Sequence, residues 1–322
     1  NEAIQQQDSP ISEARVIKVA TTPLVKSFPS TTMVLGLALI TAIVSATAAA
    51  TLREHFDNVF RSPRQLEVNA SITPLGLLPV LSKKERVAAF RISGPKTHRV
   101  SRAPDVTRYV VGAPSSRFSE AIGTIKIASD IAGYTRQCKV ISVLSALDQE
   151  GRTTVAANLG QFIALSGSKA LLIDADLRNR SMSNALAPEA TIGLFEVLEH
   201  RVPIEEAVYK DPETGLDFLP AVGDPPVYTG SVLVSDAMRT LLGAAESRYD
   251  YVVIDLPPIQ SVVSAQTAAH LSDGLVMVVE WGKTTRDEVL VALETIPEIR
   301  DKLLGGVLNK VNLATLKRYR NS

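Results

Sequence analysis

The chain has 322 residues, enough for one large domain or for a medium-sized domain with appended segments. Its 34 basic and 34 acidic side chains give a formal net charge of zero, so composition offers no electrostatic case for a nucleic-acid partner. The single cysteine, Cys138, excludes a disulfide framework and a cysteine-based zinc site. The four histidines show no metal-ligand spacing, so we assign none of them to a metal.

The chain begins at Asn1 without a methionine or a signal-peptide pattern, so we expect a fragment that lacks its N-terminal part. Thr32–Leu52 then runs for 21 residues without a charged side chain. About 20 apolar residues cross the hydrocarbon core of a bilayer, so we predict a membrane-spanning helix here. A buried helix of a soluble domain is the alternative.

Flanking charge predicts the orientation of this segment. Basic side chains are more numerous after it than before it, which places the C-terminal part in the cytoplasm and residues 1–31 outside. We expect residues 53–116 to form a juxtamembrane linker, because Pro63 interrupts the helical pattern of Asp57–Val68. The basic, proline-containing stretch Lys96–Ser116 indicates a flexible tether, with contact to anionic lipid headgroups as the alternative.

Residues 117–322 alternate between apolar strands and helices. This pattern predicts an α/β domain with a doubly wound, mostly parallel sheet and helices on both faces. The predicted strands are Lys139–Ser145, Lys169–Ala175, Leu216–Leu219, Tyr251–Asp255, Leu275–Glu280 and Gly305–Leu308. The predicted helices are Phe118–Ile131, Thr153–Ser166, Leu194–Glu199, Ile204–Tyr209, Ser235–Ser247, Ser261–Leu271 and Thr285–Ile299.

A loop follows the first of these strands and leads into a helix. In this arrangement the backbone N–H groups at a helix N-terminus face an anion. The loop matches the phosphate-loop pattern G-x-x-x-x-G-K-[ST] at Gly151 and Thr153, but Ala146 replaces the first glycine and Arg152 replaces the lysine. Gly282-Lys283-Thr284 also resembles part of this pattern. It lacks the upstream glycine, so we interpret it as a turn that matches by chance.

Acidic residues end two further strands. Asp174 and Asp176 lie at the end of one, and Asp255 ends the other. Mg²⁺ binds one or two carboxylates together with substrate phosphates, and ligands of open α/β sheets bind at strand ends. Either acidic strand end alone could merely cap a helix. Together with the loop they predict a nucleotide and magnesium site.

Three segments resemble the bacterial tyrosine kinase (BY-kinase) family, in the MinD/ParA-type branch of P-loop ATPases. They are SALDQEGRTTVAANLGQFIALSGSKALLIDADLRNRSM, YDYVVIDLPP and GGVLNKV. The uncharged segment, followed by FRSPRQLEV and LGLLPVL, is similar to the second transmembrane helix and juxtamembrane region of polysaccharide co-polymerases. ARVIKVATTPLVKSFP fits the end of a periplasmic domain. The resemblance implies a homo-oligomer in the bacterial inner membrane that works with polysaccharide polymerase and export machinery.

The resemblance also implies roles for individual residues. ATP would bind at Glu150, Gly151, Arg152, Thr153, Thr154, Asp255 and Asn309, with Asn309 at the adenine base. Mg²⁺ would be held by Thr153, Asp174 and Asp255, and the catalytic residues would be Asp174, Asp176 and Arg152. The family phosphorylates its own C-terminal tyrosine cluster, for which Tyr319 is the candidate acceptor here.

Several positions depart from the family pattern. The family's P-G-E-G-K-[ST] is Asp148-Gln149-Glu150-Gly151-Arg152-Thr153 in this chain. Each change acts against phosphate binding. The guanidinium of arginine is planar and wider than the compact ammonium of lysine. Gln149 replaces a glycine that lets the loop turn freely, and Asp148 adds a negative charge beside an anion site.

Two functional hypotheses follow. In the first, the chain is an exopolysaccharide co-polymerase subunit, weak or inactive in ATP-dependent tyrosine autophosphorylation, whose ATPase-like domain serves oligomerisation and docking. In the second, it is an active autokinase with Tyr319 or a partner's tyrosine as acceptor. A partition-type ATPase is a distant third, and the membrane segment argues against it.

Overall fold

A computed structural model of the chain describes residues 28–55, 58–81, 99–100, 106–134, 138–223, 232–260, 266 and 269–316. The chain divides into two units, Asn1–Asp57 and Asn58–Ser322, which we describe separately. The predicted end of a periplasmic domain and the acceptor candidate Tyr319 lie outside the described residues, so both stay predictions.

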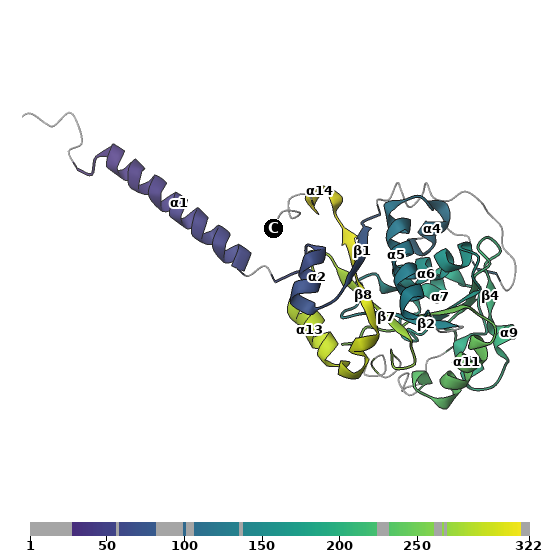
Figure 1. Cartoon of the computed structure of the whole chain (residues 1–322). Helices are drawn as coiled ribbons and strands as arrows, with labels where there is room; N and C mark the ends of the chain where they lie inside the picture. Colours follow the sequence, from purple (N-terminus) through teal and green to yellow (C-terminus); the bar gives the residue numbers. More distant parts are fainter. Residues whose placement is uncertain are drawn as a thin grey trace, which may run out of the picture. The chain divides into compact units, whose positions relative to one another are not determined.

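The first unit contains helix α1 (Thr31–His55), coloured purple in Figure 1. Within it, Thr31–Ala49 is long and apolar enough to cross a membrane. The hydroxyls of Thr47 and Thr51 donate to carbonyls one turn earlier, at 2.8 and 3.0 Å, so they need no partner outside the helix. The predicted helix is confirmed, and its passage through a membrane remains a prediction from length and composition.

The described strands of the second unit form one eight-stranded sheet. They are β1 (Pro74–Pro79), β2 (Lys139–Ser145), β3 (Ala170–Asp174), β4 (Tyr209–Lys210), β5 (Asp217–Leu219), β6 (Tyr251–Asp255), β7 (Gly274–Glu280) and β8 (Leu303–Val311). Their order is β1-β8-β7-β2-β6-β3-β5-β4. All described neighbours are parallel except β4 and β5, which confirms the predicted, mostly parallel sheet.

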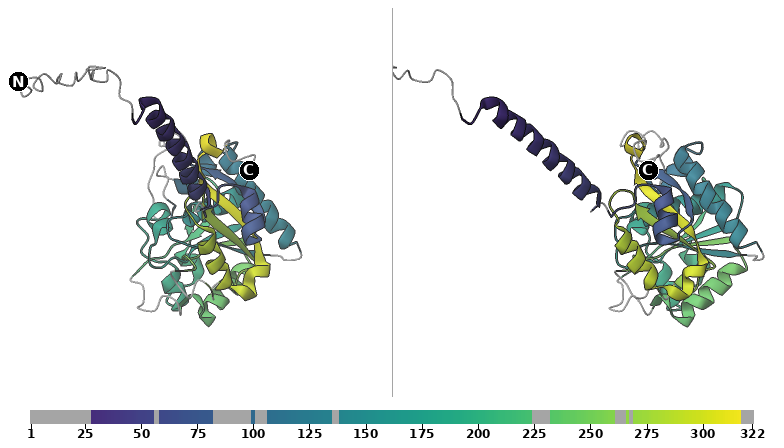
Figure 2. Two further views of the ribbon diagram at one scale, coloured as in Figure 1. Left: turned by 90° about the vertical axis from the view of Figure 1, so that its left-hand side faces the viewer. Right: turned by 60° about the vertical axis from the view of Figure 1, so that its left-hand side comes forward.

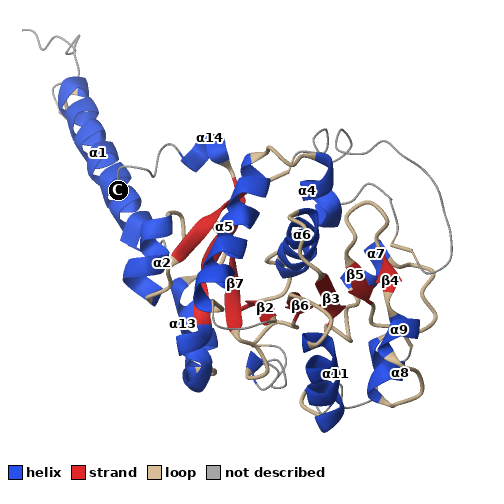
Figure 3. Ribbon diagram, turned by 45° about the vertical axis from the view of Figure 1, so that its right-hand side comes forward, coloured by secondary structure: helices blue, strands red, loops and turns tan. Residues whose placement is uncertain are grey.

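Helices cover both faces of this sheet, as predicted, with α5 and α6 on one side and α11 and α13 on the other (Figure 3). The helices of this unit are α2 (Pro63–Ala70), α4 (Tyr109–Gly112), α5 (Arg117–Ala132), α6 (Arg152–Leu165), α7 (Ser181–Leu186), α8 (Leu194–Leu198), α9 (Ile204–Ala207), α11 (Asp236–Glu246), α13 (Arg286–Glu294) and α14 (Leu313–Leu316). Two 3-10 helices are η1 (Val106–Arg108) and η2 (Pro297–Lys302). Strands β2, β3 and β6 are apolar on both faces because both faces are buried.

The structure differs from the predicted linker at residues 58–81. Pro63 does not interrupt a helix but begins α2, at a position where its missing N–H needs no partner. Strand β1 pairs in parallel with β8, although the two are far apart in sequence (Figures 1 and 2). Gly305 permits this approach, because a Cβ there would lie 2.2 Å from the carbonyl oxygen of Thr73. The globular unit therefore begins before Arg117.

A second part of the predicted linker also packs into this unit. Residues 106–112 form η1 and α4 against α6. Two buried amides of α6 hold this segment, because Asn158 accepts from the N–H of Val110 at 2.9 Å and Gln161 donates to the carbonyl of Thr107 at 2.9 Å. The basic composition of this segment gave no sign of these contacts.

The remaining differences concern helix ends. The predicted helix Ile204–Tyr209 stops at Ala207, and Tyr209 belongs to β4. The predicted helix Thr285–Ile299 is α13 followed by η2, since Pro297 cannot continue an α-helix. The predicted helix Ser261–Leu271 falls largely outside the described residues.

Strand β1 offers a direct test of its place in the core. Leu78 is fully buried, whereas Val80, just after the strand, is 50% exposed. We expect Leu78→Ala to lower the free energy of unfolding by about 2–5 kcal/mol, because it leaves a cavity. The control Val80→Ala should change it by less than about 0.5 kcal/mol. Urea titration followed by the fluorescence of Trp281 measures both, and equal effects would place β1 outside the core.

Candidate functional site

Three of the sequence-predicted segments meet at the carboxyl ends of β2, β6 and β3. These strands are neighbours in the sheet, and Asp174 at the end of β3 is paired in register with Asp255 at the end of β6. The loop 146–151 follows β2 and leads into α6. Ligands of open α/β sheets bind at such strand ends, so the fold gathers these residues where a site is expected.

The backbone of the loop has two residues in the left-handed region. Gly151 has a φ of 93°, and a Cβ there would lie 2.0 Å from the side-chain amide of Asn309. Gln149, with a φ of 64°, takes the same conformation without being glycine. The loop thus keeps its shape although the family's glycine is missing, at a cost of about 1–2 kcal/mol.

The loop is held from strands β7 and β8. The amide of Asn309 donates to the carbonyl of Glu150 at 2.8 Å, and the ammonium of Lys310 donates to the carbonyl of Gln149. The carboxylate of Glu150 accepts from the N–H of Leu147 at 2.7 Å, from the N–H of Glu280 at 3.2 Å and from the hydroxyl of Thr284. Burial raises the pKa of Glu150. Its side chain therefore links the loop to the end of β7 and to the turn that follows it.

The N–H groups of residues 148–151 donate to no acceptor within the described part of the chain. They precede α6, whose N-terminus adds a partial positive charge. Unpaired amides at a helix N-terminus are the usual donors to a phosphate. The backbone of this loop fits a phosphate group.

Arg152, the first residue of α6, points into the site and is only 5% exposed. Its Nε donates to Asp255 Oδ1 at 2.9 Å, and one terminal nitrogen donates to Asp176 Oδ2 at 2.7 Å. The other terminal nitrogen donates to the hydroxyl of Ser145 at 3.2 Å. One guanidinium thus joins the ends of three strands.

Asp174 is fully buried, and both of its carboxylate oxygens accept hydrogen bonds. One carboxylate oxygen accepts from the N–H of Asp176 at 3.1 Å, and the other accepts from the N–H and the hydroxyl of Ser183 at 2.9 and 2.6 Å. Burial, and then the negative charge of Asp255, raise the pKa of Asp174 to about 7. Burial also raises the pKa of Asp255, although Arg152 opposes the shift, and Asp255 Oδ2 has no hydrogen-bond partner.

A divalent cation does not fit between Asp176 and Asp255 in this arrangement, because Arg152 lies there. Mg²⁺ needs carboxylate oxygens that are free to coordinate it. Here Asp176 Oδ2 and Asp255 Oδ1 accept from Arg152, Asp176 Oδ1 accepts from the N–H of Asn179, and both oxygens of Asp174 accept from protein donors. Asp255 Oδ2 is the remaining oxygen of these three carboxylates, and it has no hydrogen-bond donor. Among the described residues, no group of three or more His, Cys, Asp or Glu side chains is arranged to hold a metal.

The structure brings together most of the predicted site residues. Arg152, Asp176 and Asp255 are in contact, and Asp174 is paired with Asp255 along the sheet. The hydroxyl of Thr153 accepts from that of Ser181 at 3.3 Å, and the carbonyl of Thr154 accepts from Asn158 at 2.8 Å.

The sequence analysis missed four residues of the site: Ser145, Ser183, Thr284 and Lys310. Thr284 could have been found from the sequence, because it belongs to Gly282-Lys283-Thr284, the segment that we interpreted as a turn matching the pattern by chance. The turn is present, and its Thr284 contacts Glu150. Ser145 and Ser183 carry no motif that would single them out, and Lys310 lies in GGVLNKV, where only Asn309 was assigned a role.

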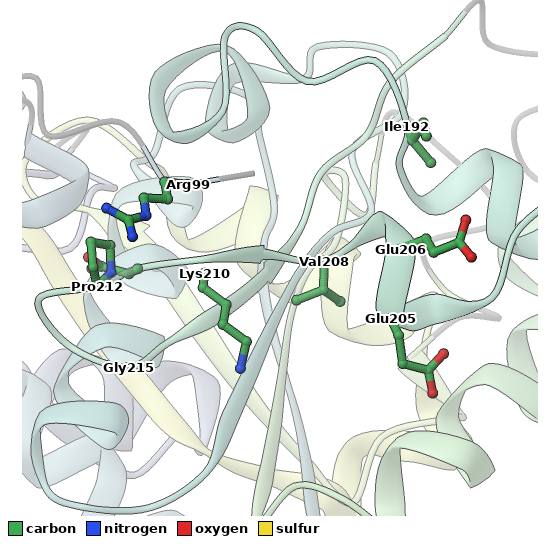
Figure 4. Close-up of a pocket in the computed structure, with 9 residues that line it drawn as sticks. Arg99, Ile192, Glu205, Glu206, Val208, Lys210, Pro212 and Gly215 are labelled. Atoms are coloured by element: carbon green, nitrogen blue, oxygen red, sulfur yellow. The ribbon is translucent and has the colours of Figure 1, made fainter. Parts of the chain in front are cut away.

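Among the described residues of this unit, two hollows stand out. One, of about 450 Å³, lies at the carboxyl ends of β1 and β8 and includes Arg117 and Asn312 in its lining. The other, of about 660 Å³, lies beside β4, between Arg99 and Lys210 on one side and Glu205 and Glu206 of α9 on the other (Figure 4). Both have the size of small-molecule sites. The first lies close to Asn309 and Lys310 along β8, and the second carries charges of both signs.

A strand, a loop that leads into a helix and acidic residues at neighbouring strand ends define a protein of the P-loop class. Comparison with known proteins agrees with this. The AAA domain family matches residues 138–309. The chain is 36% identical over 223 residues to the tyrosine-protein kinase YwqD of Bacillus subtilis (strain 168), which covers 69% of this chain and 94% of that protein.

A second relative is the succinoglycan biosynthesis transport protein ExoP of Rhizobium meliloti (strain 1021), 34% identical over 331 aligned positions. The alignment covers 99% of this chain but 42% of that protein, so the chain spans less than half of its length. Among solved structures, the kinase domain of the Escherichia coli tyrosine kinase ETK has the same fold, with a TM-score of 0.68 and 24% identity over 78% of this chain and 95% of that one. The chain belongs to the bacterial tyrosine kinase (BY-kinase) family of P-loop proteins.

The hydrogen bond from Asn309 of β8 to the loop can be tested by replacing Asn309. We expect Asn309→Ala to lower the free energy of unfolding by about 1–3 kcal/mol, because the buried carbonyl of Glu150 loses its donor. Asn184 is an exposed residue of α7, and Asn184→Ala should change that free energy by less than about 0.5 kcal/mol. Urea denaturation of both variants makes the comparison, and two equal values would show that the hydrogen bond adds no stability.

Proposed function

We propose that this chain is the membrane-anchored, BY-kinase-like part of an exopolysaccharide biosynthesis and export protein of the polysaccharide co-polymerase type. Similarity to ExoP along 99% of the chain supports this, as does an apolar helix directly before the kinase-like unit. The helix anchors the chain in the bacterial inner membrane with the kinase-like unit in the cytoplasm. The chain forms a homo-oligomer and acts with polysaccharide polymerase and export machinery.

We further propose that tyrosine autophosphorylation by this chain is weak or absent. The observation that carries this proposal is the burial of Arg152 between Asp176 and Asp255. To contact the β- and γ-phosphates of ATP, the guanidinium must leave both carboxylates, and a buried carboxylate without its partner is costly. A planar fork also reaches between two phosphates less readily than an ammonium. ATP and Mg²⁺ are therefore bound weakly or not at all.

The second candidate is an active autokinase. The free amides of residues 148–151 favour it, together with the aspartates that lie where the family's lie. In this case a phosphate entering the loop displaces Arg152 from the carboxylates and keeps it as a phosphate ligand. Both candidates share the same process, which is the synthesis and export of a cell-surface polysaccharide.

Phosphotyrosine formation separates the two candidates. We expect the purified full chain in detergent, incubated with ATP and Mg²⁺, to form no phosphotyrosine above the level of its Asp174→Ala variant, as measured by mass spectrometry. Phosphotyrosine that forms in the unmodified chain and disappears in Asp174→Ala would establish the active autokinase.

Restoring the family's loop should strengthen nucleotide binding. In the double variant Gln149→Gly/Arg152→Lys, glycine relieves the left-handed backbone at residue 149 and lysine supplies a point charge. We expect at least a tenfold gain in ADP affinity, equivalent to about 1.4 kcal/mol, by titration calorimetry. Arg239→Gln, which removes a positive charge from the exposed face of α11, is the control and should change nothing. An unchanged affinity in the double variant would mean that these two positions do not limit binding.

A further inference from the structure

The guanidinium of Arg152 lies between two carboxylates. One is that of Asp255 at the end of β6, and the other is that of Asp176 just after β3. The side chains of both partners are almost completely buried, with 4% of Asp176 and 0% of Asp255 exposed. A positive charge is thus built into the cluster of carboxylates at the strand ends.

The contacts of this charge are to the kinds of atom that a divalent ion would bind, although only Asp255 belongs to the metal ligands that the resemblance implies. A hard cation at this place would take oxygens from Asp176, from Asp255 and from a nearby hydroxyl. Arg152 donates hydrogen bonds to the same kinds of atoms, namely Asp176 Oδ2, Asp255 Oδ1 and the hydroxyl of Ser145. The planar guanidinium contacts these three acceptors, at or just after the ends of three strands, with three separate nitrogens. A lysine ammonium has its three donors on one nitrogen, so it would need all three acceptors around a single point.

We propose that Arg152 is the resident cation of this site and takes the place of a divalent metal ion between Asp176 and Asp255. The site then neutralises its carboxylates without a metal, and it binds no divalent cation there with or without a nucleotide. The proposal rests on the proposed function only in treating the loop as a nucleotide site. It concerns which ion the carboxylates bind, not whether phosphoryl transfer takes place.

Manganese binding tests the proposal without measuring activity. We expect Arg152→Gln, in the full chain in detergent, to gain one saturable Mn²⁺ site by electron paramagnetic resonance, because two buried carboxylates then lack a counter-cation. The site should disappear in Arg152→Gln/Asp255→Asn. The wild-type chain should lack it, both alone and with ADP, and so should Arg239→Gln, which loses an arginine far along the chain on α11. Circular dichroism verifies that each variant is folded.

Two results would overturn the proposal. One is a Mn²⁺ site in the wild-type chain that Asp255→Asn removes, since the metal would then displace Arg152. The other is a folded Arg152→Gln chain that gains no Mn²⁺ site, since the carboxylates would then not form a cation site. If Arg152→Gln folds only when Mn²⁺ is added, the ion replaces the arginine and the proposal is supported. If it folds under neither condition, the wild-type measurement decides. Phosphotyrosine assays are independent of all these outcomes.

Discussion

Two fully buried carboxylates, Asp174 and Asp255, lie opposite each other at the ends of adjacent parallel strands. Burying two neighbouring negative charges is unfavourable unless each finds hydrogen bonds or a cation. Asp174 accepts from the two donors of Ser183, and Asp255 accepts from Arg152. Burial raises the pKa of both carboxyls. The identity of the residue at position 152 therefore affects both the stability of the sheet and the chemistry of the loop.

The shape of the loop depends on neighbouring strands rather than on glycine alone. Asn309 and Lys310 of β8 hold its carbonyls, and Thr284 holds the carboxylate of Glu150 from the turn after β7. That turn is bound in its own right by the segment after the apolar helix, because the N–H of Gly282 donates to Phe60 and the indole of Trp281 donates to Arg61, both at 2.8 Å. Segments far apart in the sequence thus fix the geometry of the loop 146–151.

The sequence predicted the parallel sheet and the three loops of the site because both leave local patterns. Runs of apolar residues identified β2, β3 and β6, and the acidic residues at strand ends identified Asp174 and Asp255. Strand β1 could not be found in this way, since a strand of six residues gives little periodic signal. Its partner β8 is also distant in the sequence. The direction of the Arg152 side chain also could not be predicted from the sequence. The motif shows that an arginine is present, whereas its direction depends on the competition between phosphate, carboxylates and solvent.

The pairing of β1 with β8 has a consequence for the integrity of the folded unit. A chain beginning at Arg117, where the sequence suggested a boundary, would lack β1 and leave the N–H and C=O groups of one side of β8 unpaired. Exposed strand edges of this kind recruit strands from other molecules and promote aggregation. The short segment after the apolar helix therefore covers the edge of β8 with β1, an edge strand whose first and last residues, Pro74 and Pro79, have no N–H to offer a further strand.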